Sequence, residues 1–180
     1  HVSLVDAIVL MAASPRPIHF IMHYRIFRVP VLRWIFRLAG CIPVASRHDD
    51  PRVYERAFDR AAQALRAGEL VCIFPEGAIT RDGQLQPFKA GMAKILEQAD
   101  RDGLQVPVVP MALKGLWGSY FSRIEEDGAM VRPFRRGMFN PVEVDIGRPL
   151  APQSVTPEGL RQQVSALLAR PMLGVRGPAG

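Results

Sequence analysis

The chain opens with a histidine and an aspartate separated by four residues, His1-Val2-Ser3-Leu4-Val5-Asp6. Imidazole exchanges a proton near neutral pH, and a neighbouring carboxylate can fix its tautomer and stabilise the imidazolium that forms. These two residue types are the minimum needed for a general base, so we consider His1 and Asp6 a candidate catalytic dyad. A plain structural interpretation also exists, because Ser3 and Asp6 have the spacing of a helix capping box.

The position of the helix start decides whether the two side chains can meet. In a continuous helix, residues five apart point about 140° away from each other around the axis. If Ser3 is the N-cap, the helix begins at Leu4 and His1 lies in the incoming loop, from which it can fold back over the first turn. The segment therefore predicts both a helix start and a dyad.

Alternating strands and helices are predicted to position these residues. Apolar runs predict strands at residues 18–22, 42–45, 70–74, 106–113 and 142–146. Helices are predicted from Pro51, after the N-cap Asp50, to the glycine at 68, from about residue 89 to 99, and after the cap at Thr156. This order predicts an α/β fold, a single domain with a largely parallel central sheet covered by helices. Ligands of such sheets bind at the carboxyl ends of the strands, where Pro75-Glu76-Gly77 falls.

Length and composition favour one domain. The 180 residues, 48% of them apolar, suffice for one buried core but not for two. We assign residues 1–173 to this domain and 174–180 to a disordered tail. Because the chain begins with His inside its most informative motif, we expect it to be part of a longer protein. Cys41 and Cys72 lie in apolar contexts, which predicts buried, reduced thiols.

The net charge of +6 is unevenly distributed. No acidic residue occurs between Ala7 and His48, an interval with six arginines and several aromatic residues, and a second basic and aromatic cluster covers residues 132–139. Nucleic acid or an anionic membrane could bind such surfaces. The aliphatic content of residues 30–40 favours a membrane surface over nucleic acid as the partner, and we expect no nucleic-acid binding. A core helix with two snorkelling arginines, Arg33 and Arg37, remains an alternative.

Four segments in order carry a family resemblance. They are His1-x4-Asp6, the run from Gly40 to Arg47, Phe74-Pro75-Glu76-Gly77, and Val106-Pro107-Val108-Val109-Pro110. Their order and spacing resemble the four motifs of the glycerolipid acyltransferases, the family of lysophosphatidic acid and glycerophosphate acyltransferases. The resemblance extends to about residue 150. It implies an O-acyltransferase of phospholipid synthesis that moves a fatty acyl group from an acyl thioester to a lysophospholipid or glycerophosphate hydroxyl.

The resemblance also implies roles for individual residues. His1 would remove the proton from the acceptor hydroxyl, and Asp6 would orient the imidazole ring. Arg47 would bind the acceptor phosphate, since guanidinium and phosphate can form paired hydrogen bonds. The alternative for Arg47 is a solvated arginine at a strand end.

The third motif is linked to acceptor binding. A glutamate would repel phosphate, so we expect Glu76 to hold a glycerol hydroxyl or a nearby arginine, while Gly77 permits close backbone approach. Lys89 would add positive charge near the phosphate. The alternatives are a simple turn at Pro75-Glu76-Gly77 and a solvated lysine at a helix start. The fourth motif is expected to pack around the acyl chain.

One departure bears on the acceptor. Many lysophosphatidic acid enzymes continue the third motif with Thr-Arg, whereas Ile79 stands here in place of the arginine. The acceptor is therefore expected to be less anionic, as in the branch that acts on lysophosphatidylethanolamine or is fused behind a transporter-like region.

No metal or cofactor is expected, because no cluster has metal-ligand spacing. The co-substrate would be acyl-CoA or an acyl carrier protein thioester, and the absence of a Gly-x-Ser-x-Gly elbow disfavours an acyl-serine intermediate. The expected partners are the membrane surface and a lysophospholipid acceptor. The expected location is the cytoplasmic face of the cell membrane, with the protein peripheral or tethered through a missing upstream region. The alternative function is a catalytically inactive membrane-lipid-binding domain of the same fold.

Overall fold

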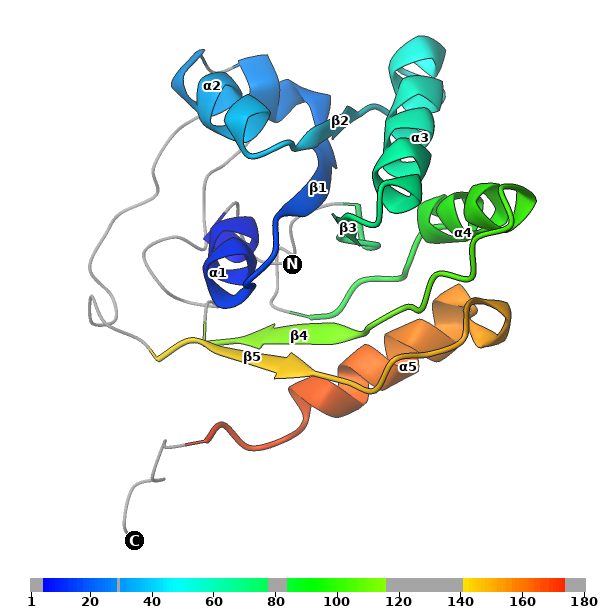
Figure 1. Ribbon diagram of the computed structural model, residues 1–180. Helices are drawn as coiled ribbons and strands as arrows, with labels where there is room; N and C mark the ends of the chain where they lie inside the picture. The colour runs from blue at the N-terminus through cyan, green and yellow to red at the C-terminus, as the bar shows by residue number, and fades with distance from the viewer. Residues whose placement is uncertain (1–4, 29, 78–83, 116–140, 174–180) are drawn as a thin grey trace, which may run out of the picture.

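A three-stranded parallel sheet forms the centre of the fold. The computed structural model describes residues 5–28, 30–77, 84–115 and 141–173 (Figure 1). Strand β1 (Ile18–His23) lies between β2 (Ile42–Val44) and β3 (Leu70–Ile73). Ile21 of β1 is in register with Ile42 of β2 and with Ile73 of β3. The three carboxyl ends therefore meet at one edge of the sheet.

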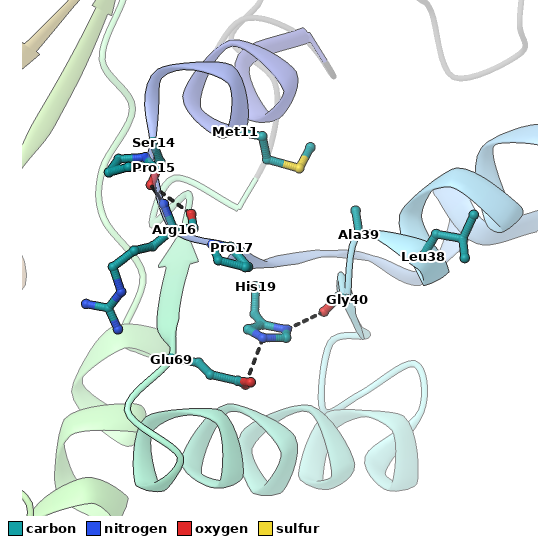
Figure 2. Close-up of a pocket in the computed structure, with 10 residues that line it drawn as sticks. All are labelled: Met11, Ser14, Pro15, Arg16, Pro17, His19, Leu38, Ala39, Gly40 and Glu69. Atoms are coloured by element: carbon teal, nitrogen blue, oxygen red, sulfur yellow. Dashed lines mark hydrogen bonds and ion pairs between the residues drawn. The ribbon is translucent and has the colours of Figure 1, made fainter.

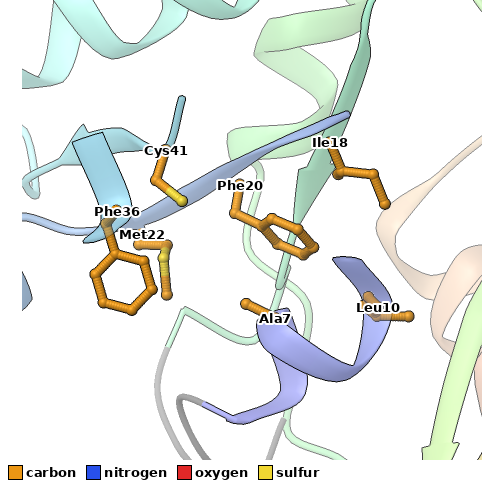
Figure 3. Packing of buried hydrophobic residues seen from close by; sticks show 7 residues of the cluster. All are labelled: Ala7, Leu10, Ile18, Phe20, Met22, Phe36 and Cys41. Carbon is orange, nitrogen blue, oxygen red and sulfur yellow. The ribbon is translucent and has the colours of Figure 1, made fainter. Parts of the chain in front are cut away.

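Helices cover both faces of this sheet because β1 alternates its apolar side chains between them. On one face, α1 (Val5–Ala13) and α2 (Pro30–Leu38) contribute Ala7 and Phe36 to a cluster with Phe20 (Figure 3). On the other face, α3 (Pro51–Arg66) and α4 (Gly91–Arg101) pack Phe58 and Ile95 against Ile21. The 3₁₀ helix η1 (Tyr24–Arg28) joins β1 to the α2 region.

A second, antiparallel sheet pairs β4 (Met111–Lys114) with β5 (Glu143–Ile146). One face of it is covered by α5 (Pro157–Leu168), which follows the 3₁₀ helix η2 (Pro152–Ser154) and packs Val164 and Leu167 against Ala112. The Lys114 ammonium is buried and lies 2.6 Å from an oxygen of Asp145 and 3.5 Å from an oxygen of Glu143. A cross-strand ion pair therefore fastens the two strands together.

The predicted α/β class and the helix-covered parallel sheet are confirmed. The helix caps are also confirmed, since Asp50 accepts a hydrogen bond from the Val53 N–H and Thr156 accepts one from the Gly159 N–H. The strand predicted at residues 106–113 is shorter, because β4 begins only at Met111 and Val108 forms an isolated bridge with Leu150. Prolines at 107 and 110 have no N–H to donate, which interrupts the ladder there.

Several predictions fall on residues outside the described ranges. These are the cap at Ser3, the basic cluster at 132–139 and the tail at 174–180. Within the described residues, none of the helices combines the length and the apolar character needed to span a bilayer. Both cysteines are free thiols; Cys41 is buried as predicted, whereas Cys72 is only partly buried.

A histidine joins three segments at the amino end of the sheet. His19 Nδ1 lies 2.8 Å from the carbonyl oxygen of Gly40, and His19 Nε2 lies 2.8 Å from a carboxylate oxygen of Glu69 (Figure 2). These contacts tie β1 to the turns that precede β2 and β3. Gly40 has a φ of +69°, and a Cβ there would lie 2.6 Å from His19 Nδ1. The turn therefore needs glycine both for its backbone conformation and for the space that the imidazole occupies.

Replacing Gly40 should therefore destabilise the fold more than replacing a comparable glycine. Gly68 has a similar φ of +73°, but no atom lies within 4 Å of the place that a Cβ would occupy, so Gly68→Ala carries only the backbone strain. We expect Gly40→Ala to lower the free energy of unfolding by about 1–2 kcal/mol more than Gly68→Ala, because it also displaces His19 from its partners. Urea unfolding of both variants measures the difference. Equal losses would contradict the role assigned to His19.

Burial raises the pKa of the Cys72 thiol to about 12, from 9.0 for an exposed cysteine. Burial also raises the pKa of Cys41, while a backbone hydrogen bond at Phe20 acts in the opposite direction. Cys72 therefore keeps its proton in the folded protein at a pH where the unfolded chain has lost it. The unfolded state is favoured as the pH rises from about 9 towards 12.

We expect Cys72→Ala to flatten the alkaline fall in stability. Above pH 9 the wild-type free energy of unfolding should decrease more steeply than that of the variant, by up to about 1.4 kcal/mol per pH unit. Urea unfolding at a series of pH values between about 8 and 10.5 measures both slopes, and other titrating groups contribute equally to each. Parallel slopes would show that the thiol of Cys72 titrates normally in the folded protein.

Candidate functional site

The third motif lies at the carboxyl edge of the parallel sheet, directly after β3. Glu76 is buried, with 5% of its surface exposed, and its Oε2 accepts a hydrogen bond of 2.9 Å from the Gln86 N–H. The Lys89 N–H donates to the Pro75 carbonyl at 2.7 Å. Two backbone donors of the segment before α4 therefore hold the motif in place. Burial of the Glu76 carboxylate is compatible with folding because it accepts such hydrogen bonds.

Gly77 turns the chain beside a lysine side chain. Its φ is +65°, and its N–H donates to the Phe74 carbonyl at 3.0 Å. A Cβ at this position would lie 2.8 Å from Lys89 Nζ and 2.9 Å from Lys89 Cδ. The Lys89 side chain therefore occupies the space that a Cβ at position 77 would need. The structure brings together three of the predicted site residues, Glu76, Gly77 and Lys89.

Asp6 lies in the first turn of α1 and is 1% exposed. The positive end of the helix dipole favours a carboxylate at this position. The next residue, Ala7, belongs to the same cluster as Phe20, whose ring stacks on that of Phe74 with centroids 6.0 Å apart. Packing through Phe20 and Phe74 therefore links the α1 layer to the strand end that carries Glu76. His1 is outside the described residues, so the geometry of the dyad remains a prediction.

Arg47 lies at the same edge but on the other side of the central strand. It follows β2 by three residues and is exposed, next to a turn in which the Asp49 and Asp50 N–H groups donate to the Ser46 carbonyl. Because β1 separates β2 from β3 and neighbouring strands are about 4.8 Å apart, Arg47 and Glu76 extend from strands about 10 Å apart. The structure does not place Arg47 in contact with Glu76, Gly77 or Lys89.

The negative charges at this edge are buried and the positive charges are exposed. The carboxylates of Asp6 and Glu76 are buried, whereas Arg47 and Lys89 are exposed. Neither cation forms an ion pair with a described residue. Because neither cation is paired with a described residue, each can bind an anion without first breaking an internal ion pair. A phosphate group is the chemical class that this arrangement suits.

His23 is a residue at this edge that the sequence interpretation missed. It is the last residue of the central strand, is half-buried and lies in register with Val44 of β2. Its ring tilts against that of Tyr24 with centroids 4.9 Å apart, and its Nδ1 faces the Arg25 N–H at 3.4 Å. The sequence did contain a signal for this residue, because His23 directly follows the apolar run predicted as a strand at residues 18–22. Its position places an imidazole between the strand ends of Arg47 and Glu76.

A large hollow in the described part of the protein lies elsewhere. It has a volume of about 500 Å³ and is lined by residues that include Met11, Arg16, His19, Leu38 and Glu69 (Figure 2). These residues surround the amino end of β1, at the opposite edge of the sheet from Glu76. Among the described residues, no group of three histidine, cysteine, aspartate or glutamate side chains is placed to hold a metal ion.

Comparison with known proteins identifies relatives for most of the chain. Residues 1–114, which include every candidate site residue, match the model of the family described as Acyltransferase. The chloroplastic 1-acyl-sn-glycerol-3-phosphate acyltransferase of Brassica napus is 35% identical over 115 residues, which are 64% of this chain and 31% of that protein. An N-acylphosphatidylethanolamine synthase of Arabidopsis thaliana is 27% identical over 84 residues, which are 46% of this chain and 28% of that protein.

A solved structure shows the same fold. The 1-acyl-sn-glycerophosphate acyltransferase PlsC from Thermotoga maritima superposes with a TM-score of 0.59 at 23% identity, covering 93% of this chain and 60% of that one. The chain spans about a third of the length of the first two curated relatives it matches, 31% and 30%. The family match over residues 1–114 includes both helix-covered faces of the parallel sheet and the whole candidate site. The chain therefore belongs to the acyltransferase family, among the glycerolipid acyltransferases.

Proposed function

We propose that this protein transfers a fatty acyl group from an acyl thioester to a hydroxyl of a lysophospholipid or glycerophosphate, as a step of phospholipid synthesis. The observation that carries the proposal is the edge of the parallel sheet, where Glu76, Gly77 and Lys89 meet and Arg47 lies exposed. The 1-acyl-sn-glycerol-3-phosphate acyltransferases among its relatives support the same reaction class. The proposed location is the cytoplasmic face of the cell membrane, where such an acceptor resides.

The proposed chemistry is attack of the acceptor hydroxyl on the thioester. His1 accepts the hydroxyl proton as the oxygen bonds to the thioester carbonyl carbon, and Asp6 stabilises the resulting imidazolium. The carbon–sulfur bond then breaks, and the leaving sulfur takes the proton back from His1. The products are an ester and a free thiol of coenzyme A or an acyl carrier protein. General-base assistance of this kind accelerates a reaction by about 10²- to 10⁴-fold.

The proposed acceptor contacts follow from which charged side chains are exposed and which are buried. Lys89 and Arg47 are exposed and would bind the acceptor's phosphate from two sides of the edge. Glu76 is buried and bonded to the Gln86 N–H, so its contribution is to hold the segment that carries Lys89 against the strand end. Because a glutamate repels phosphate, the proposal also includes a contact of Glu76 with a glycerol hydroxyl or with a nearby arginine.

The identity of the acceptor depends on how many cations surround its phosphate. Ile79 replaces the arginine of many lysophosphatidic acid enzymes, which favours a less anionic acceptor such as lysophosphatidylethanolamine. The relatives named for 1-acyl-sn-glycerol-3-phosphate favour lysophosphatidic acid. Both acceptors belong in the same assay, with labelled acyl thioesters of coenzyme A and of an acyl carrier protein as donors.

We expect His1→Ala to reduce acyl transfer by about 10²- to 10⁴-fold, because the general base is removed. Transfer of a labelled acyl group by the full-length protein measures the loss. His48→Ala is the matched control, since His48 is exposed and lies within the same family match. Equal turnover of wild type and His1→Ala would refute the assignment of His1 and Asp6 as a catalytic dyad. Absence of transfer by wild type to any acceptor would instead favour an inactive lipid-binding domain.

We expect Lys89→Ala to raise the KM for a phosphate-bearing acceptor by about tenfold, because one charge-assisted hydrogen bond to the phosphate is lost. The change in kcat should be smaller. Lys89→Arg should restore most of the affinity. The control is Lys94→Ala on α4, whose ammonium contacts Glu55 and the rings of Tyr54 and Phe58 away from the site. An unchanged KM in Lys89→Ala for both acceptors would exclude a phosphate contact.

A further inference from the structure

Helix α2 exposes an unusual amount of apolar surface. Trp34 is 68% exposed, Leu38 74% and Ile35 49%, whereas Phe36 of the same helix is completely buried. We refer to Trp34, Ile35 and Leu38 as the α2 stripe. In Figure 1 the helix lies at the periphery of the fold, and in Figure 3 Phe36 projects among the core residues Met22 and Cys41.

Helical geometry explains how α2 can have two apolar faces. Successive residues are about 100° apart around the axis, so Trp34 and Leu38 lie about 40° apart and Ile35 is adjacent to both. Phe36 points roughly 150° away from the centre of this stripe. One side of the helix therefore packs against the sheet, and the opposite side presents the stripe to the surroundings. This excludes the alternative in which the apolar residues of α2 are all core residues.

Two cations border the Trp34 edge of the α2 stripe. Arg33 and Arg37 are exposed, lie one helical turn apart and make no ion pair with any described residue. The interval from Ala7 to His48 contains no carboxylate that could neutralise them locally. The stripe and its flanking arginines therefore form a basic amphipathic surface with a tryptophan near its centre.

We propose that α2 lies in the headgroup region of a bilayer that contains anionic lipids, with the α2 stripe immersed and Arg33 and Arg37 on lipid phosphates. Interfacial helices combine these features, and tryptophan is enriched at the depth of the headgroups. Tryptophan and arginine are also enriched at protein interfaces, so binding of a protein at α2 in place of vesicles is the outcome that would refute the membrane surface.

The connection of α2 to the rest of the fold relates this surface to the candidate site. The chain leaves the carboxyl end of β1 through η1, enters α2 at Pro30 and returns to the amino end of β2. The start of α2 therefore follows the strand edge that carries the site. The role of the membrane contact rests on the proposed function, since the contact would hold that strand edge near lipid acceptors. Binding to the membrane can be measured without acyl transfer.

The first experiment uses the fluorescence of Trp34. The chain has two tryptophans, so Trp117→Phe leaves Trp34 as the single reporter. Vesicles of phosphatidylcholine with phosphatidylglycerol should shift its emission to shorter wavelength, and lipids brominated on the upper part of the acyl chain should quench it. Vesicles of phosphatidylcholine alone should bind more weakly, and added salt should weaken the anionic contribution. Unchanged emission of the folded protein with anionic vesicles would overturn the proposal.

The second experiment compares paired variants by vesicle sedimentation. W34S/L38S removes apolar area from the stripe, and its control, I146S/L168S, removes exposed side chains from β5 and α5. R33E/R37E reverses the flanking charges, and its control, R52E/R56E, changes two exposed arginines of α3 with the same spacing. We expect each α2 variant to lose about tenfold or more in binding to anionic vesicles and each control to lose little. Equal losses in variants and controls would overturn the proposal.

A third measurement separates this inference from the proposed function. We expect the ratio of turnover on vesicle-resident acceptor to turnover on a monomeric short-chain acceptor to fall in the α2 variants and to stay unchanged in the controls. Vesicle binding through α2 without any acyl transfer would refute the proposed function and leave the membrane surface supported. Acyl transfer without vesicle binding, or binding of an acidic carrier protein at α2 in place of vesicles, would refute the membrane surface.

Discussion

The parallel pairing of β1 with both of its neighbours is the constraint on which the rest of the structure depends. Ile21 lies opposite Ile42 and Ile73, and both faces of β1 are buried by helices. A shift of one residue would exchange the Phe20 face with the Ile21 face, so packing on both sides specifies the register strongly. This register brings three carboxyl ends to one edge. The third motif, the end of the central strand and Arg47 lie along that edge for this reason, with Arg47 separated from the third motif by β1.

The candidate site combines buried carboxylates with exposed cations. A buried charge is tolerated only when hydrogen bonds or opposite charges compensate it, and Glu76 meets this condition through the Gln86 N–H. Arg47 and Lys89 lie exposed at the surface, where water can satisfy their hydrogen-bond donors. Glu76 therefore holds the segment before α4 against the strand end, and in the proposed function the two cations bind the acceptor phosphate. Helix α2 likewise serves two purposes, because it completes the core through Phe36 and presents Trp34 outward.

Features governed by neighbouring residues were predicted well. The caps at Asp50 and Thr156 depend on a side chain and an N–H three residues later, so both could be identified in advance. The strand expected from residue 106 was too long, because prolines interrupt its hydrogen bonding. Its antiparallel partner, β5, begins about thirty residues later in the chain, and no local pattern specifies such a pairing. The hydrophobic run identified an extended segment but not its neighbour.

The sequence alone determined the helix and strand types, the α/β class and the motif residues, because periodicity, capping and motif order are properties of neighbouring positions. Only the tertiary structure decided that Lys89 covers Gly77, that Arg47 stands apart from them across β1, and that His23 joins the same edge. It also decided which side of α2 faces outward. These relations depend on packing between segments that are distant in the chain, and the residue types at each position are compatible with several such arrangements.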